Sequence, residues 1–116
     1  MSTTTRKDAA RKLTRNAQLF AALGDKVRLD LLSKLSDGRS CSITQLAAGS
    51  VITRQAITKH LRVLQDAGIV RRSRQGRESL FQLDPKPLQD ARESLDVISR
   101  QWDDALARLK SFVESE

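Results

Sequence analysis

The sequence contains one cysteine, one histidine, two prolines and no tyrosine among its 116 residues. The single Cys41 excludes a disulfide within the chain, and the single His60 excludes a histidine-rich metal site in one chain. No stretch approaches the run of about 20 apolar residues that spans a bilayer, so we expect no membrane partner. The first residues lack the apolar core of a secretory signal. These absences predict a cytoplasmic protein.

Motifs of catalysis are also lacking. The sequence has no Ser/His/Asp constellation, no glycine-rich phosphate loop and no set of metal ligands. A carboxylate-only site from Asp96, Asp103 or Asp104 is conceivable, but acids on a long helix are more often a solvated face. Soft and borderline metals prefer thiolate and imidazole ligands. We therefore predict no enzyme activity, no catalytic residue, no metal and no cofactor.

The net charge of +7 is unevenly distributed. Residues 53–77 contain seven Lys or Arg and a single acid, Asp66, whereas residues 85–116 contain five Lys or Arg and seven Asp or Glu. A basic patch of this kind favours a polyanionic partner, although an ordinary solvated surface has the same composition. The C-terminal segment is excluded as a nucleic-acid surface.

The apolar pattern predicts a mainly α chain with one small β-hairpin. A mobile tail over residues 1–7 precedes a domain over residues 8–84, and a long helix over residues 85–116 belongs to the same domain. Ser42 and Gln45 have the spacing of a capping box, Thr53 is a good N-cap, and Gly68 suits a helix C-terminus. The expected helices are 8–23, 25–35, 42–48 and 53–67, and the expected strands 69–73 and 79–83 flank a loop over 74–78.

The helix expected after Thr53 divides into two faces. Ile57, Leu61 and Leu64 recur at i, i+4 and i+7 and predict a buried stripe. Long and hydroxyl side chains near a helix N-terminus reach base edges in the major groove, and the N-terminus itself favours phosphate. A surface helix that binds nothing shows the same division. The candidate DNA-binding residues are Thr53, Arg54, Gln55, Thr58, Lys59 and Arg62, followed in the hairpin by Arg74 and Arg77.

Three segments resemble the ArsR/SmtB family of bacterial regulators. They are LFAALGDKVRLDLL at 19–32, ITQLA at 43–47 and TRQAITKHLRVLQDAGIV at 53–70, and the similarity covers roughly residues 15–83. The resemblance implies a winged helix-turn-helix homodimer that acts at promoters on double-stranded operator DNA, usually as a repressor released by an inducer. Position by position, it places Arg54, Gln55, Thr58 and Lys59 among base-reading residues and residues 74–77 at the wing tip.

The sequence departs from the family at its metal-sensing positions. Ser42 and Thr44 stand where many members have a Cys-x-Cys pair, and residues 85–116 contain no histidine. We therefore predict a regulator that does not respond to metals. Cys41 is either a redox sensor near a helix N-terminus or a structural cysteine without a second thiol. An effector could be a small organic molecule, a partner protein or an oxidant, and constitutive repression is a further alternative.

The last helix carries a heptad pattern over four repeats. Such a stripe needs a partner surface, which is either the protein's own core or the same helix of a second chain about a two-fold axis, joined by the first helix. We expect the homodimer, with Trp102 at its centre. The predicted interface residues are Leu88, Leu95, Trp102 and Leu109 at one position and Ala91, Ile98, Ala105 and Phe112 three residues later.

Three classes of function follow from these features. We expect a sequence-specific DNA-binding repressor that binds an inverted repeat as a homodimer. The second class is a winged-helix adaptor for proteins, in which the arginines of the hairpin are only a solvated surface. The third class, a small enzyme, lacks every motif that it needs.

Overall fold

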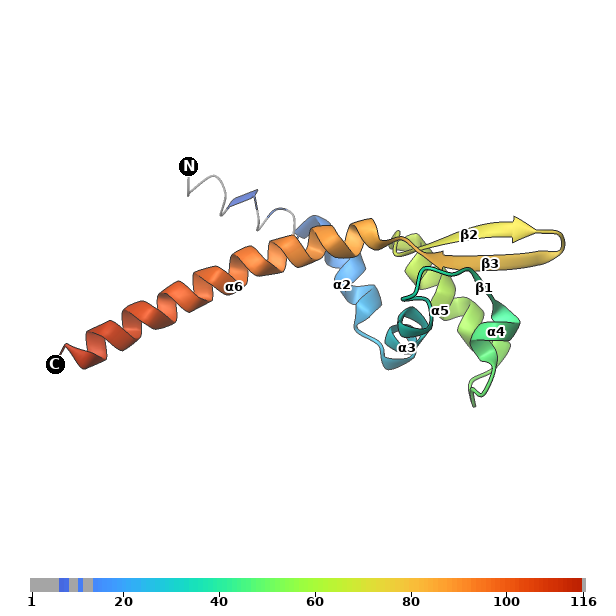
Figure 1. Cartoon of the computed structure of the whole chain (residues 1–116), viewed down its shortest axis with the longest axis horizontal. Coiled ribbons are helices and arrows are strands. Elements are labelled where there is room, and N and C mark those ends of the chain that lie inside the picture. The colour runs from blue at the N-terminus through green and yellow to red at the C-terminus, as the bar shows by residue number, and fades with distance from the viewer. Residues whose placement is uncertain (1–6, 9–10, 12–13, 116) are drawn as a thin grey trace. The chain divides into compact units, whose positions relative to one another are not determined.

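A computed structural model describes residues 7–8, 11 and 14–115 of the chain. The expected tail over residues 1–7 falls, apart from Lys7, outside the described residues. The chain divides into two compact units, of which one is Ala17–Leu88. The other contains the part of the last helix that begins at Gln89. Figure 1 shows the order of the elements along the chain.

The first described elements are α2, Ala17–Leu23, and α3, Lys26–Lys34. The expectation of one continuous helix over residues 8–23 is wrong, because a turn at Asn16 precedes α2. Asparagine is a poor helix former, since its side chain competes for nearby backbone groups. Asp25 then caps α3, and its Oδ1 accepts hydrogen bonds from the backbone N–H of Val27 at 2.9 Å and of Arg28 at 3.1 Å.

The next two helices form the helix-turn-helix, with α4 at Ile43–Ala47 and α5 at Arg54–Asp66. The capping box is confirmed, because Ser42 Oγ accepts from the Gln45 N–H at 3.2 Å while Gln45 Oε1 accepts from the Ser42 N–H at 2.8 Å. The N-cap of α5 is also confirmed, because Thr53 Oγ1 accepts from the Ala56 N–H at 3.1 Å. These caps fix where each helix begins.

The sheet contains β1, Cys41–Ser42, β2, Val70–Gln75, and β3, Glu78–Leu83, in the antiparallel order β1-β3-β2. The hairpin was expected, whereas β1 was not. The predicted loop over residues 74–78 is also too long, since only residues 76–77 separate β2 from β3. Gly76 has φ +63°, and Arg77 has no positive φ, which matches a type II′ turn.

The core of the Ala17–Leu88 unit lies around α5, which contacts α2, α3, α4 and β2. Gly68, with φ +78°, ends α5 and turns the chain into the sheet. Cys41 is 7% exposed and pairs with Phe81 across the sheet. Reactive cysteines are partly exposed, so this burial favours the structural interpretation of Cys41. The most deeply buried apolar side chains of the unit are Leu35, Leu46, Ile57, Leu61, Leu64, Ile69 and Val70.

The last helix, α6, is continuous over Pro85–Glu114, as predicted. At the start of this helix, Asp84 Oδ1 accepts a hydrogen bond from the Lys86 N–H at 3.2 Å. Proline is tolerated in the first turn, because the backbone N–H that it lacks would have no partner within the helix. Thirty helical residues span about 45 Å. Of the described helices, none combines the length and the apolar composition that crossing a bilayer requires.

Candidate nucleic-acid interface

The exposed face of α5 carries the candidate reading residues. Ile57, Leu61 and Leu64 are at most 1% exposed and hold the helix against the core, which confirms the predicted stripe. The polar side chains therefore lie on the opposite side, where water or a ligand reaches them. The exposed candidates on or next to this helix are Thr53, Arg54, Gln55, Thr58, Lys59 and Arg62.

Two threonines of this face have local hydrogen bonds that decide what they offer to a partner. Thr53 Oγ1 accepts from the Ala56 N–H, so its hydroxyl proton is left to donate outward. Thr58 Oγ1 donates instead to the Arg54 carbonyl at 2.8 Å. Thr58 therefore presents oxygen lone pairs and a methyl group. Helical spacing alone did not indicate this difference.

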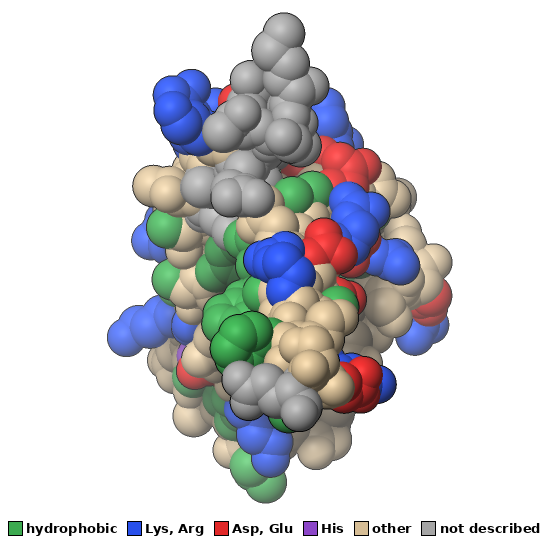
Figure 2. Space-filling view, turned by 90° about the vertical axis from the view of Figure 1, so that its left-hand side faces the viewer, with side chains coloured by type: hydrophobic (Ala, Val, Ile, Leu, Met, Phe, Trp, Pro, Cys, Tyr) green, Lys and Arg blue, Asp and Glu red, His purple; other side chains and the backbone are tan. Residues whose placement is uncertain are grey.

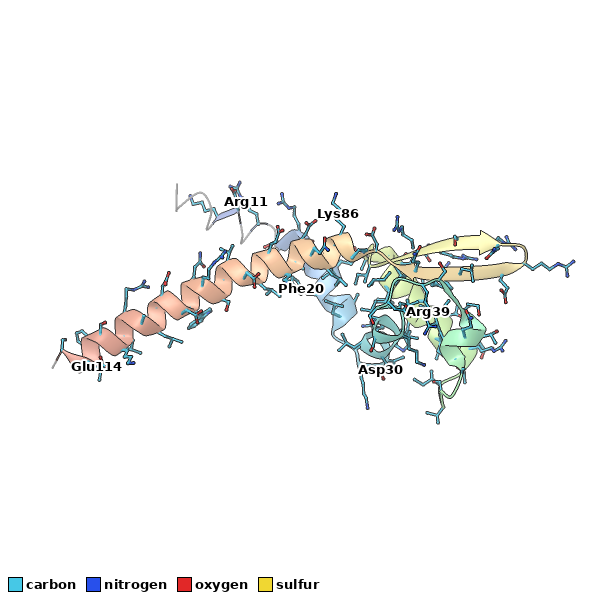
Figure 3. The ribbon with its side chains drawn as sticks, in the orientation of Figure 1. Arg11, Phe20, Asp30, Arg39, Lys86 and Glu114 are labelled. Carbon is cyan, nitrogen blue, oxygen red and sulfur yellow. The ribbon has the colours of Figure 1, made fainter. Side chains whose placement is uncertain are left out.

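The hairpin carries the second basic group of the unit. Arg74 lies in β2 and Arg77 in the turn, and both are exposed. The hairpin extends beyond the helices of its unit (Figure 1), and its side chains project from the ribbon along its length and at its tip (Figure 3). The site residues of α5 and of the hairpin thus lie in the same compact unit.

Arg72 belongs to the same basic hairpin, although the sequence pattern did not place it among the candidate DNA-binding residues. Its Nε and Nη2 donate to Ser79 Oγ at 3.1 and 2.9 Å, so the guanidinium is held across the hairpin. Residues 70, 72 and 74 alternate with 71 and 73 along β2, which places Arg72 and Arg74 on one face. Strand alternation was the signal that could have found it.

A second group that the sequence pattern did not indicate joins α3 to α5. Nη1 of Arg28 lies 3.2 Å from Nδ1 of His60. Asp25 Oδ1 is 3.9 Å from the same His60 Nδ1. The pKa of the Asp25 carboxyl lies below its ordinary value of 3.8, first because the Arg28 N–H donates to it and then because the charge of Arg28 favours the carboxylate. Arg28 thus contacts both the cap of α3 and His60 of α5.

Metal-binding side chains are not gathered in this structure. Within residues 7–8, 11 and 14–115, no three side chains of His, Cys, Asp or Glu form a group that could hold a metal ion. The absence of a metal response stays a prediction.

The predicted interface residues of α6 differ in exposure. Leu95, Trp102, Leu109 and Phe112 are exposed, at 48%, 65%, 59% and 64%. Ala91 is buried, and the remaining three, Leu88, Ile98 and Ala105, are half-buried. Figure 2, which faces the C-terminal end of α6, shows hydrophobic side chains exposed on this side. The described chain leaves much of the apolar stripe of α6 open to solvent.

Comparisons with known proteins agree with this geometry. A family model described as a helix-turn-helix domain matches residues 23–73. The uncharacterised HTH-type transcriptional regulator YuzN of Bacillus subtilis is 37% identical over 78 residues, which cover 62% of this chain and 85% of YuzN. The HTH-type transcriptional regulator Rv2034 of Mycobacterium tuberculosis is 33% identical over 97 residues, which cover 84% of this chain and 87% of Rv2034.

A solved structure extends the likeness to three dimensions. An ArsR-like transcriptional regulator from Rhodococcus sp. RHA1 superimposes with a TM-score of 0.73 at 35% identity, covering 86% of this chain and 93% of that one. The region that the family model matches includes α4, α5 and the start of β2, the first strand of the hairpin. The chain belongs to the ArsR family of winged helix-turn-helix transcriptional regulators, which bind DNA.

Proposed function

We propose that this regulator is a repressor that binds an inverted-repeat operator as a homodimer and does not respond to metals. The observation that carries the proposal is the two-sided α5. Its apolar residues are buried in the core, while Arg54, Gln55 and Lys59 are exposed near its N-terminus. An exposed polar face at the start of the second helix of a helix-turn-helix is the part that enters the major groove.

The side chains of this face match the donors and acceptors of base edges. Arginine and lysine donate to the two acceptors of guanine, and glutamine pairs with adenine in a bidentate manner. Thr58 offers lone pairs and a methyl group, because its hydroxyl already donates its hydrogen bond to the Arg54 carbonyl. It therefore suits an amino group of adenine or cytosine, or the methyl group of thymine. Thr53 keeps its hydroxyl proton for a phosphate oxygen.

Arg74 and Arg77 of the wing contact phosphates or the minor groove in this proposal. Both are exposed, and Arg77 lies in the two-residue turn between β2 and β3. Contacts to the backbone position a protein on the duplex without reading its sequence. In this proposal these two arginines contribute affinity for any DNA, while α5 distinguishes one DNA sequence from another.

The exposed apolar stripe of α6 supports the homodimer. Trp102, Leu109 and Phe112 are each more than half exposed in the single chain, and contiguous apolar patches of this kind mark interaction surfaces. A second copy about a two-fold axis covers the stripe with its own. The two reading helices then address half-sites one helical turn apart, about 34 Å.

We propose that the protein does not respond to metals because the thiolate pair that many family members use is lacking. Ser42 and Thr44 stand at its two positions, and the single Cys41 is buried. We further propose that the protein acts in the cytoplasm and catalyses no reaction. Its effector, if it has one, is a small organic molecule, a partner protein or an oxidant.

DNase I footprinting upstream of the protein's own gene tests the proposal. The expected result is protection of an inverted repeat, with half-sites one turn apart, and lower transcription from that promoter in vitro. Zinc, cadmium or arsenite at stoichiometric levels is expected to leave the protection intact, and Cys41→Ser is expected to keep full binding.

Three outcomes would contradict parts of the proposal. Weak DNA binding that is indifferent to sequence would favour a protein-binding adaptor. Increased transcription would reverse the sign of regulation. A tight equimolar metal complex that abolishes protection would establish a metal site.

A further inference from the structure

A hollow of about 220 Å³ lies between α5 and the sheet, within the Ala17–Leu88 unit. Both α5 and the hairpin, which carry the candidate DNA-binding residues, contribute to its lining. None of its lining residues is acidic, and three are cationic. Its polar lining consists of Thr58, Lys59, Arg62, Gln65, Arg72 and Ser79.

The register of the hairpin explains why Arg72 faces this hollow. Arg72 pairs with Phe81 across the strands, and paired residues share a face of a sheet. Phe81 is 4% exposed, so this face is the one that covers the core. Arg71 lies on the opposite face, where its Nε is 3.9 Å from Asp84 Oδ2. Neighbouring arginines of one strand therefore have different surroundings.

The guanidinium of Arg72 is oriented before any ligand arrives. Ser79 Oγ accepts from Nε at 3.1 Å and from Nη2 at 2.9 Å, which leaves Nη1 without a partner in the part of the chain that the structure describes. Lys59 and Arg62 form no ion pair with any described residue. Cations that converge without an acid favour an anion, and an arginine fork matches the oxygens of a phosphate.

We propose that this hollow binds one backbone phosphate of duplex DNA, held jointly by Arg62 of α5 and Arg72 of the hairpin. The proposal rests on the proposed function and adds a shared contact between the reading helix and the wing. One phosphate held from both elements fixes the depth and angle at which α5 lies in the groove. Ser79 acts as a positioning residue, because it orients Arg72 and does not itself carry charge.

Fluorescence anisotropy with a short duplex of arbitrary sequence tests this, since a phosphate contact does not depend on sequence. Arg72→Ala is expected to lower affinity about tenfold, the effect of one charge-assisted hydrogen bond. Arg71→Ala is the matched control, with the same loss of charge from the adjacent residue, and its affinity is expected to stay near that of the wild type. Ser79→Ala is expected to weaken binding, and Ser79→Thr, which keeps the hydroxyl, to restore it.

The salt dependence of the DNA affinity measures how many phosphates the protein neutralises. Each neutralised phosphate contributes about −0.9 to the slope of log K against log salt. If Arg62 and Arg72 hold the same phosphate, the Arg62→Ala, Arg72→Ala double variant loses about 0.9 of slope, whereas two separate contacts lose about 1.8. A thermal unfolding midpoint unchanged in each variant separates these effects from misfolding.

Several results would overturn the proposal. Equal losses for Arg71→Ala and Arg72→Ala, or a slope change corresponding to two phosphates, would remove the shared contact while leaving DNA binding itself intact. Inorganic phosphate that displaces DNA from the wild type more than chloride does at equal ionic strength, and does not do so from Arg72→Ala, would assign the hollow to a free phosphate compound. A wild type that binds no duplex would instead reject the proposed function.

Discussion

Nη1 of Arg28 lies 3.2 Å from Nδ1 of His60, so a side chain of α3 meets one of α5 directly. The same guanidinium donates to two carbonyls of α2, from Nε to Ala22 at 2.6 Å and from Nη2 to Ala21 at 3.3 Å. Because arginine has only donors, this contact uses Nδ1 of His60 as the acceptor. Arg28 thus joins the end of α2 to the helix that carries the reading face.

Replacing Arg28 by alanine is expected to destabilise the Ala17–Leu88 unit. The change removes the Arg28 donor from the Ala22 carbonyl and from Nδ1 of His60, and hydrogen bonds to charged groups contribute about 1.5 to 3 kcal/mol. We expect a comparable decrease in the free energy of unfolding, measured by urea denaturation.

Arg39→Ala is the control for this variant. Arg39 is paired with Asp37 at 2.8 Å on an exposed loop, where such pairs contribute about 0 to 1 kcal/mol. A double-mutant cycle with His60→Ala isolates the contact between α3 and α5. Arg28→Ala that is no less stable than Arg39→Ala would show that the network does not hold the helices together.

The cap of α3 predicts a dependence of stability on pH. The pKa of Asp25 is lowered in the folded chain, mainly by the hydrogen bond from the Arg28 N–H, relative to its ordinary value of 3.8. A depressed carboxyl pKa stabilises the folded state above the unfolded value, and this stabilisation is lost as pH falls through the folded value. The stability difference between wild type and Asp25→Ser is therefore expected to shrink below about pH 4. A constant difference in urea denaturation from neutral to acid pH would contradict it.

Gln55 and Arg77 are expected to differ in what they contribute to DNA binding. Gln55→Ala removes a base-reading side chain and is expected to cost about 1 to 3 kcal/mol on the preferred operator and to relax sequence preference. Arg77→Ala is expected to weaken all sequences similarly and to flatten the salt slope. Gel shifts on single-base operator variants measure both. Unaltered discrimination by Gln55→Ala would remove this residue from the reading set.

Local signals predicted much of this fold, because each rests on neighbouring residues. The capping box at Ser42, the cap at Thr53 and the buried stripe of α5 depend on fixed spacings along one helix, and all are confirmed. The break at Asn16 and the two-residue strand β1 were missed. A strand of two residues has no periodicity, and its existence depends on pairing with β3, about forty positions later.

The candidate site shows the same limit. The exposed polar face of α5 followed from periodicity, whereas the hollow between helix and wing needed the register of the hairpin. The contact of Arg28 with His60 joins residues 32 positions apart, and no local pattern encodes it. Side-chain pairs formed by tertiary packing are the part that sequence reasoning could not supply.

The stripe of α6 predicts that DNA affinity depends on dimerisation. Trp102 is 65% exposed in the single chain, so burying it between two chains removes a large aromatic surface from water. Trp102→Ala is expected to cost the dimer about 3 to 5 kcal/mol if the site behaves as a buried aromatic core position. Because dimer stability depends on protomer concentration, the loss appears as concentration-dependent dissociation and unfolding.

Sedimentation velocity on the wild type and on a Leu95→Asp, Trp102→Ala double variant measures this directly. Leu95 occupies the same heptad position one repeat earlier, so an aspartate there places a charge in the same interface. We expect a dimeric wild type that prefers an inverted repeat to a single half-site, and a monomeric variant that has lost this preference. Asp103→Asn, a change on the same helix outside the stripe, is the control and is expected to stay dimeric. A monomeric wild type, or a variant that stays dimeric and binds the inverted repeat as tightly, would place the interface elsewhere.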